Sequence, residues 1–249
     1  MRINTITQTI FTGNTNINLF DKYNKPIPQE KLQLRGACAQ FADTFDLDVN
    51  ATKAPYFTFP MRTQTPYRIN LLKNVPQLNR TISAYVPVLI HKNATQKSGE
   101  DEILKGIYRA YTNLTQKIVK ESIEANPQAT QKLPSHRINI NIFNSAGNPI
   151  PQDELYNIDE YKQLANIFGV SINVNKNKYS TTGMRMQTPY TIEVSKTLPG
   201  IGEIISSEPI GINKNMLQRN LEAEIRQGIY TAYTKLTEKI VDAILKLKK

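Results

Sequence analysis

Apolar and polar residues alternate in several short segments of the chain, which is the pattern of a β-strand with one buried face. The alternation is clearest in residues 137–143 and 190–194, and it recurs in residues 67–71 and 86–90. Residues 170–174 form a further strand candidate. These segments predict sheets that each bury one face and expose the other.

Apolar residues at steps of three or four predict two kinds of helix. A short helix is expected at residues 158–168, followed by Gly169 at a position that suits the left-handed conformation of a helix end. Residues 32–45 show the same pattern, with Asp46 in place of the glycine. A long amphipathic helix is expected near the C-terminus, along the apolar stripe of Leu217, Leu221, Ile225, Ile229, Ala232, Leu236, Ile240 and Ile244.

Three blocks of sequence occur twice, at a nearly constant separation of 122 or 123 residues. The second block matches at six of seven positions and the third at eight of ten, so chance does not explain the repeat. A repeat found in this way determines the expected architecture. The paired segments are 17–29 with 140–152, 61–67 with 184–190, and 106–115 with 228–237.

The repeat predicts two tandem homologous units, each an α+β fold with the order β-α-β-β-β-α. Each unit is expected to hold an antiparallel or mixed sheet, a short helix and a long C-terminal amphipathic helix. The predicted boundaries are residues 1–125 for the first repeat and 136–249 for the second, with a polar, proline-flanked linker at 126–135. Residues 1–11 are expected to add an extra N-terminal strand, and the copies to be related by a pseudo-two-fold axis.

The chain is basic, with 31 Lys and Arg against 21 Asp and Glu, a net charge of +10. Residues 1–123 hold 16 basic and 9 acidic side chains (+7), and residues 124–249 hold 15 and 12 (+3). A basic protein is drawn toward polyanions such as nucleic acid. The alternative is that the charge is a solvated surface produced by a lysine-rich, low-GC coding background.

Several classes of function have no support in the sequence. Cys38 is the one cysteine of 249 residues, which excludes an intramolecular disulfide, and the spacings of zinc sites, nucleophile motifs and phosphate loops are missing. No catalytic residue, metal site or cofactor is therefore predicted. No apolar run approaches about 18 residues, so no membrane partner is expected. Without a signal peptide, we expect a cytoplasmic or intravirion protein that is not secreted.

The block at 61–67 and 184–190 contains the first candidate site. Arg62 and Tyr67 recur as Arg185 and Tyr190, and two symmetric pairs of a cation and an aromatic ring suit contact with a nucleic-acid strand. The alternative is structural: a turn, a proline that opens the next strand, and a tyrosine in the core.

The block at 106–115 and 228–237 contains the second candidate site. Tyr108 and Thr115 fall together on one flank of the predicted helix, and Tyr230 and Thr237 repeat this placement. We expect this edge to form a contact between the repeats or with a partner, because a two-fold arrangement brings equivalent surfaces together. A ligand-binding role is the alternative. In the same region, Glu100 is expected to complement a helix dipole.

Three functions follow in order of support. The first is a non-enzymatic protein that contacts nucleic-acid backbone through a pseudo-symmetric, two-repeat surface. The second is a structural subunit of an oligomeric assembly, such as a virion-like connector, ring or coat component, which would self-associate or bind neighbouring assembly subunits. The third is a small enzyme with symmetry-related sites, for which no residue pattern argues.

Overall fold

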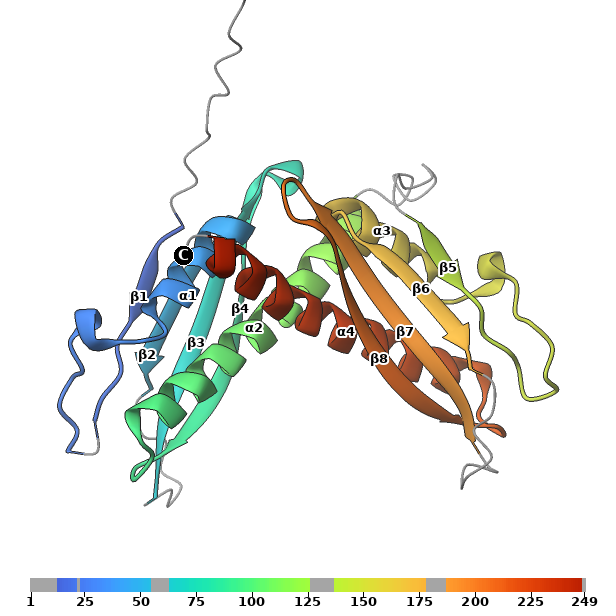
Figure 1. Ribbon diagram of the computed structural model, residues 1–249. Helices are drawn as coiled ribbons and strands as arrows, with labels where there is room; N and C mark the ends of the chain where they lie inside the picture. Colours follow the sequence, from blue (N-terminus) through green and yellow to red (C-terminus); the bar gives the residue numbers. More distant parts are fainter. Residues whose placement is uncertain (1–12, 22, 55–62, 126–136, 178–186, 248–249) are drawn as a thin grey trace, which may run out of the picture. The chain divides into compact units, whose positions relative to one another are not determined.

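The computed structural model describes residues 13–21, 23–54, 63–125, 137–177 and 187–247 (Figure 1). These residues form an α+β protein with two four-stranded sheets and four α-helices. The chain divides into two compact units. Unit 1 holds the described residues up to Asn74 together with Thr81–Ala110, and unit 2 holds Val75–Arg80 together with the described residues from Tyr111 onward.

Unit 1 contains one mixed sheet with the strand order β1-β2-β3-β4. Strand β1 runs parallel to β2, and β2 runs antiparallel to β3. The predicted order β-α-β-β-β-α is confirmed in this part of the chain. Its elements are β1 (Thr15–Ile17), α1 (Arg35–Phe45), β2 (Asp48–Lys53), β3 (Gln64–Val75), β4 (Arg80–His91) and α2 (Gln96–Ala125), the last of which continues into unit 2.

Unit 2 contains the second sheet, with the order β5-β6-β7-β8 and the same directions. The predicted short helix at 158–168 is confirmed residue for residue. The predicted strand at 137–143 is shorter, because the chain leaves the sheet after Ile140 and forms an isolated bridge between Phe143 and Pro149. The elements are β5 (Ile138–Ile140), α3 (Ile158–Phe168), β6 (Ser171–Lys176), β7 (Gln187–Leu198), β8 (Gly202–Asn213) and α4 (Gln218–Leu247).

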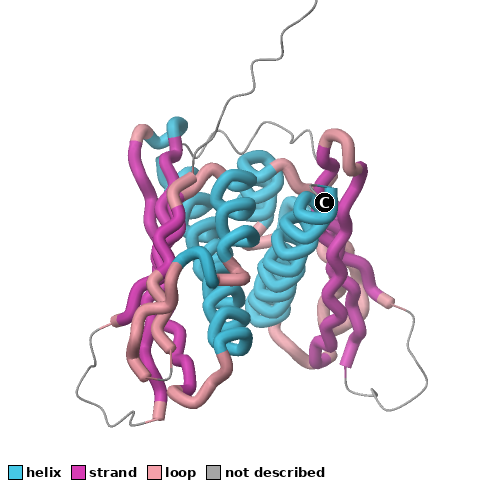
Figure 2. Tube along the Cα trace, turned by 60° about the vertical axis from the view of Figure 1, so that its left-hand side comes forward, coloured by secondary structure: helices cyan, strands magenta, loops and turns pink. Residues whose placement is uncertain are grey.

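In each unit the helices lie on one face of the sheet and leave the other face open (Figure 2). Alternation along the strands produces this division: Tyr190, Ile192 and Val194 of β7 are buried, and the residues between them are more exposed. The predicted apolar stripe of the long helix is buried from Leu221 to Ile240. The two ends of the stripe differ: Leu217 precedes α4 and is 75% exposed, and Ile244 is half-buried.

Both short helices end in the left-handed conformation, which the sequence predicts at Gly169. Gly169 has φ 62° after α3, and Asp46 has φ 50° after α1. Glycine adopts this conformation without a steric penalty, whereas most other residues do not. Cys38 lies inside α1 with no exposed surface, and burial raises the pKa of its thiol to about 12.

A glycine in each long helix allows the helix to approach its sheet closely. A Cβ atom at Gly106 would lie 2.5 Å from Cγ2 of Val88, and one at Gly228 would lie 2.3 Å from Cδ1 of Ile192. Real Cβ atoms are not found at such distances, so a larger residue would force either the helix or the facing side chain of the sheet to move. This contact explains why the glycine recurs in the repeated block.

A buried glutamate of each long helix binds the backbone that leads into the short helix. Glu100 accepts a hydrogen bond from the Leu34 N–H at 2.7 Å, and Glu222 accepts one from the Asn157 N–H at 3.3 Å. Both carboxylates are buried, and Glu100 is the fifth residue of α2. Glu100 is therefore more than a charge beside a helix dipole, because it satisfies the orphan donor at the start of α1.

Some predictions lie outside the described residues. These are the extra N-terminal strand at 1–11 and the linker at 126–135. The two compact units do not follow the repeat boundaries, since their division falls within α2 between Ala110 and Tyr111. The domain boundaries taken from the repeat stay a prediction.

Candidate nucleic-acid interface

The tyrosines of the first candidate site lie in the core. Tyr67 is 2% exposed and Tyr190 is 1% exposed. Each hydroxyl accepts a hydrogen bond from a backbone N–H, that of Phe20 at 3.1 Å and that of Phe143 at 3.2 Å. This burial agrees with the packing alternative, because a covered ring has no open face on which a base could stack.

The arginines of that site, Arg62 and Arg185, lie outside the described residues. Each precedes a described strand by two residues, since β3 begins at Gln64 and β7 at Gln187. A nucleic-acid role for these two positions stays a prediction.

The second candidate site is also buried in large part. The Tyr108 ring packs edge-on against Phe41 of α1, with ring centroids 5.5 Å apart. The Tyr230 hydroxyl donates to a carboxylate oxygen of Glu160 in α3 at 2.7 Å. These described contacts join each long helix to a short helix of the same repeat. Thr115 and Thr237 are buried inside α2 and α4.

Neighbouring positions form the contact between the two long helices inside unit 2. The rings of Tyr111 and Tyr233 are stacked with centroids 6.0 Å apart, and their hydroxyls are 3.3 Å apart. The next residue of each helix adds to this contact, because the hydroxyls of Thr112 and Thr234 form a hydrogen bond. Phe168 of α3 packs edge-on against Tyr111.

Burial disfavours the ionised form of these tyrosines. It raises the pKa of Tyr233 to about 12 and raises that of Tyr111 well above its usual value. Burial and the nearby Glu160 carboxylate also raise the pKa of Tyr230. A protonated hydroxyl can donate a hydrogen bond, which is the role that Tyr230 has toward Glu160.

The open face of the unit 1 sheet is lined by amide side chains. Asn16, Asn50 and Asn70 lie in register across β1, β2 and β3. All three are exposed or half-buried. Amide groups both donate and accept hydrogen bonds, so this row can contact phosphates, sugars or base edges.

An exposed aromatic ring and a cation lie on the same open face. The ring of Tyr85 in β4 is 65% exposed, and the guanidinium carbon of Arg68 in β3 lies 5.3 Å from its centroid. Arg68 is itself exposed, and it pairs with Thr52 of β2 across the sheet. An aromatic ring beside an arginine on an open sheet suits single-stranded nucleic acid, because the ring offers a stacking surface and the cation a phosphate contact.

The open face of the unit 2 sheet has different chemistry. The repeat places Thr191 and Ser207 at the positions of Arg68 and Tyr85. Its row of amides ends on a carboxylate, since Asn173 accepts a hydrogen bond from Asn139 at 3.0 Å and donates one to Glu193 at 3.2 Å. At these two positions the unit 2 face therefore has neither an aromatic ring nor a cation. Both open faces carry an acidic side chain, Asp48 of β2 in unit 1 and Glu193 of β7 in unit 2.

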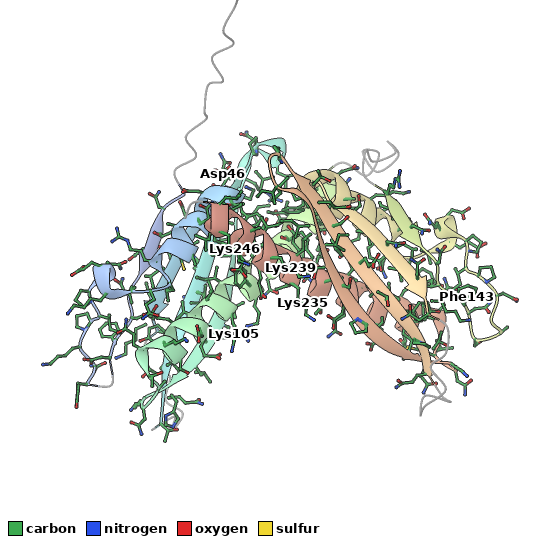
Figure 3. The ribbon with its side chains drawn as sticks, in the orientation of Figure 1. Asp46, Lys105, Phe143, Lys235, Lys239 and Lys246 are labelled. Atoms are coloured by element: carbon green, nitrogen blue, oxygen red, sulfur yellow. The ribbon has the colours of Figure 1, made fainter. Side chains whose placement is uncertain are left out.

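Two lysines of α4 are engaged within unit 2. Lys235 forms an ion pair with Glu208 of β8, and Lys239 donates to the backbone carbonyl of Ile205 at 2.8 Å (Figure 3). These contacts fasten the helix to the edge strand of its sheet. Part of the positive charge of unit 2 therefore serves packing.

No group of three or more His, Cys, Asp or Glu side chains in the described segments is arranged to hold a metal ion. Among the same segments, no helix is long and apolar enough to cross a bilayer. No protein-family model matches the chain, and comparisons with curated proteins and with solved structures gave no match.

Sequence reasoning missed Tyr85 and Arg68. The candidate sites were residues that occur in both repeats, whereas Arg68 and Tyr85 are replaced by Thr191 and Ser207 in the second repeat. The available signal was the spacing of Tyr85 along β4, where it alternates with apolar residues and so belongs to the exposed face.

Proposed function

We propose that this chain is a non-enzymatic protein that binds single-stranded nucleic acid, and that the open sheet face of unit 1 is its contact surface. The observation that carries the proposal is the exposed Tyr85 ring with Arg68 beside it. The net charge of +10 supports it, because a basic protein attracts a phosphate backbone.

The open sheet face gives this surface its preference for a single strand. Bases of a single strand are free to splay out and stack, whereas those of a duplex are already paired and stacked. Tyr85 would stack on one base, Arg68 would contact a phosphate, and the row of Asn16, Asn50 and Asn70 would hydrogen-bond to the neighbouring nucleotides.

We also propose that the chain arose by tandem duplication and that its copies are related by an approximate two-fold axis. Tyr111 with Tyr233, and Thr112 with Thr234, are pairs of positions that the repeat makes equivalent. A position contacts its own equivalent only where both lie close to a two-fold axis. The axis would then pass between α2 and α4 at these residues.

The test is fluorescence anisotropy of a labelled 20-nucleotide single strand, in DNA and RNA forms, titrated with the full chain at several salt concentrations. We expect affinity to fall as salt rises. Stacking on an aromatic ring contributes about 1–3 kcal/mol, so Tyr85→Ala is expected to weaken binding about fivefold or more. Arg68→Ala is expected to weaken binding and to reduce the salt dependence by about one phosphate contact.

The matched control is Ser207→Ala, at the equivalent position of the unit 2 face, which is expected to leave affinity unchanged. Light scattering on the same samples measures the mass of the protein. A large closed ring with no affinity for either strand would contradict the proposal and favour the structural-subunit function. Equal losses in Ser207→Ala and Tyr85→Ala would show that the contact surface is wrongly placed.

A further inference from the structure

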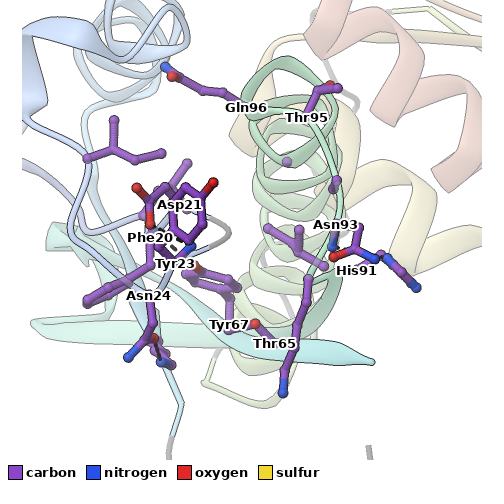
Figure 4. Close-up of a pocket in the computed structure, with 17 residues that line it drawn as sticks. Phe20, Asp21, Tyr23, Asn24, Thr65, Tyr67, His91, Asn93, Thr95 and Gln96 are labelled. Carbon is purple, nitrogen blue, oxygen red and sulfur yellow. Dashed lines mark hydrogen bonds between the residues drawn. The ribbon is translucent and has the colours of Figure 1, made fainter. Parts of the chain in front are cut away.

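Unit 1 contains a pocket of about 720 Å³ beside the end of its sheet (Figure 4). Five segments form its walls: the loop after β1, the end of β2, the start of β3, the end of β4 with the loop that follows it, and the start of α2. The close-up shows Phe20, Tyr23 and Asn24 on one side, His91 on the other, and Tyr67 between them. Its volume is within the range of about 300–1,000 Å³ that is usual for sites that bind small molecules.

The lining combines cations, hydrogen-bonding groups and aromatic rings. Lys53 and Lys92 both line the pocket, and Lys53 also lies 4.9 Å from the centroid of the Phe20 ring. Asp21 is an acidic residue of the lining, and its carboxylate accepts the backbone N–H groups of Tyr23 at 2.9 Å and Lys25 at 2.8 Å. Because that carboxylate is hydrogen-bonded within its own loop, the two lysines determine the charge preference of the pocket, which is for an anion.

Neutral polar side chains add further contacts, since Thr65, Asn93 and Gln96 also line the pocket. Tyr23 offers an aromatic surface, and its side chain is 71% exposed. A ring near two lysines matches the two chemical parts of a nucleotide, which are an aromatic base and a phosphate.

Unit 2 has a counterpart of this pocket at the equivalent positions, but its volume is about 200 Å³. The lysines are kept, as Lys176 and Lys214. Other lining positions differ: Tyr23 is replaced by Ala146, which removes the aromatic ring, and Gly99 by Leu221, which fills space. The buried Leu221 side chain lines the small pocket at the place where the glycine leaves room in unit 1.

The comparison separates what the two pockets can hold. Both retain two lysines, so both suit a phosphate. The smaller one falls below the usual size for small-molecule sites and has lost the tyrosine, so it has neither the room nor the stacking surface for a base.

We infer that the unit 1 pocket binds a nucleoside phosphate, with Lys53 and Lys92 at the phosphate and Tyr23 against the base. This site uses other residues than the open sheet face, and it does not require that the chain bind a nucleic-acid strand. The ligand would be a free mononucleotide or the phosphorylated end of a strand, because both present the same chemistry.

Isothermal titration calorimetry on the full chain tests this inference, with UMP, AMP and inorganic phosphate as probes. We expect at least one nucleotide to bind at least tenfold more tightly than phosphate. Gly99→Leu, which copies unit 2, is expected to reduce nucleotide affinity at least tenfold. A Cβ at Gly99 makes only ordinary contact, 3.6 Å from Ile90, so the backbone tolerates the change.

A second variant is needed in case Gly99→Leu does not fold. Tyr23→Ala alters an exposed side chain and is expected to weaken nucleotide binding several-fold while leaving phosphate binding unchanged. The control is the double variant Lys176→Ala/Lys214→Ala in unit 2, which is expected to keep nucleotide affinity within twofold. The inference is overturned if neither nucleotide binds more tightly than phosphate, if Tyr23→Ala has no effect, or if the unit 2 control abolishes nucleotide binding.

Oligonucleotides with and without a 5′-phosphate distinguish the two sources of the ligand. If the site takes a strand end, the phosphorylated strand binds more tightly and competes with the mononucleotide. If it takes free nucleotides, the two strands bind alike and neither competes. Repeating both titrations with Arg68→Ala/Tyr85→Ala separates this inference from the proposed function, because that variant is expected to lose strand binding on the sheet face and keep mononucleotide binding.

Discussion

Unit 1 and unit 2 share their internal packing and differ on their surfaces. Each has a glycine where the long helix meets the sheet, a buried glutamate beneath the short helix, and a buried tyrosine that accepts a backbone N–H. The open face of unit 1 carries Tyr85 and Arg68, whereas the equivalent face of unit 2 carries Ser207 and Thr191. The pocket beside the sheet is about 720 Å³ in unit 1 and about 200 Å³ in unit 2.

The difference shows what a comparison of two internal copies can reveal. Positions that both copies keep are the ones that the fold requires, such as Gly106 with Gly228. Positions that one copy has changed include the exposed Tyr85 and Tyr23 and the buried Gly99, and they carry the chemistry that the two proposals use. The predictions below test the shared packing first and the surfaces last, in order of expected effect.

The largest effect is expected from alkaline pH on unit 2. Burial raises the pKa of Tyr111, Tyr161, Tyr230 and Tyr233. Between the ordinary tyrosine pKa near 10 and the raised values, the unfolded chain loses protons that the folded chain keeps. Stability is therefore fully present below about pH 10 and falls above it, by about 1.4 kcal/mol per pH unit for each such tyrosine. Urea unfolding at pH 8, 9, 10 and 11 measures this loss, and a flat profile would contradict it.

Glu100→Ala and Glu222→Ala should each destabilise the protein by about 3 kcal/mol. Each change removes a hydrogen bond to a buried carboxylate and leaves a backbone N–H, buried at Leu34 and half-buried at Asn157, without that partner. Chemical denaturation measures the free energy of unfolding. Glu102→Ala is the matched control in the same helix, since the Glu102–Lys105 ion pair is exposed and its loss should change stability much less. Equal losses for Glu100 and Glu102 would refute the role given to the buried carboxylate.

Gly106→Ala and Gly228→Ala should each cost about 1–3 kcal/mol, because the added Cβ would overlap the sheet. Helix propensity alone predicts the opposite sign, a gain of about 0.5–1 kcal/mol. Gly36→Ala in α1 is the control, since a Cβ there meets no atom within 4 Å. Thermal unfolding distinguishes the two cases. A Gly106→Ala variant with a higher melting temperature than the parent protein would contradict the close contact between helix and sheet.

Arg62→Ala/Arg185→Ala is expected to weaken nucleic-acid binding about tenfold, or about 1.4 kcal/mol, if the repeated block contributes phosphate contacts. Anisotropy at two salt concentrations checks affinity and salt dependence together. Unchanged affinity and unchanged stability would remove both arginines from the interface. That result would leave Arg68 and Tyr85 as the contact residues on the unit 1 face.

The smallest effect is expected from Asp46→Gly, which gives α1 the helix end of α3. Asp46 has φ 50°, where glycine is favoured, so a gain of about 0.5–1 kcal/mol is expected. The ion pair between Asp46 and Lys73 is long, at 3.7 Å, and partly exposed, so its loss should cancel little of the gain in stability. In the variant, Lys73 can still donate its hydrogen bond to the backbone carbonyl of Phe45, the last residue of α1. A lower melting temperature would show that the ion pair outweighs the backbone term.

Local signals predicted much of the fold. Alternation and three-to-four spacing located the strands and helices, and Gly169 marked the end of α3. The partners of buried polar groups could not be predicted in this way. The contact of Glu100 with Leu34 joins residues 66 positions apart, and a local pattern contains no information about such a pair.

The candidate site was harder to predict than the fold. Tyr67 and Tyr190 looked functional because they recur, but an aromatic residue that recurs is also what a core needs. Tyr85 and the pocket residue Tyr23 occur in one copy alone, so comparing the two copies did not identify them as candidates. Their exposure and neighbours become visible once the strands are assembled.

Helix α2 belongs to the first repeat by sequence, yet its residues from Tyr111 onward pack within unit 2. A chain that ended after one copy would leave Tyr111 and Thr112 without their partners Tyr233 and Thr234 of α4. Under the proposed duplication, two such chains would each supply this contact to the other, as in a homodimer. Joining two copies end to end makes the contact independent of protein concentration, so we expect a single copy to fold only as a dimer.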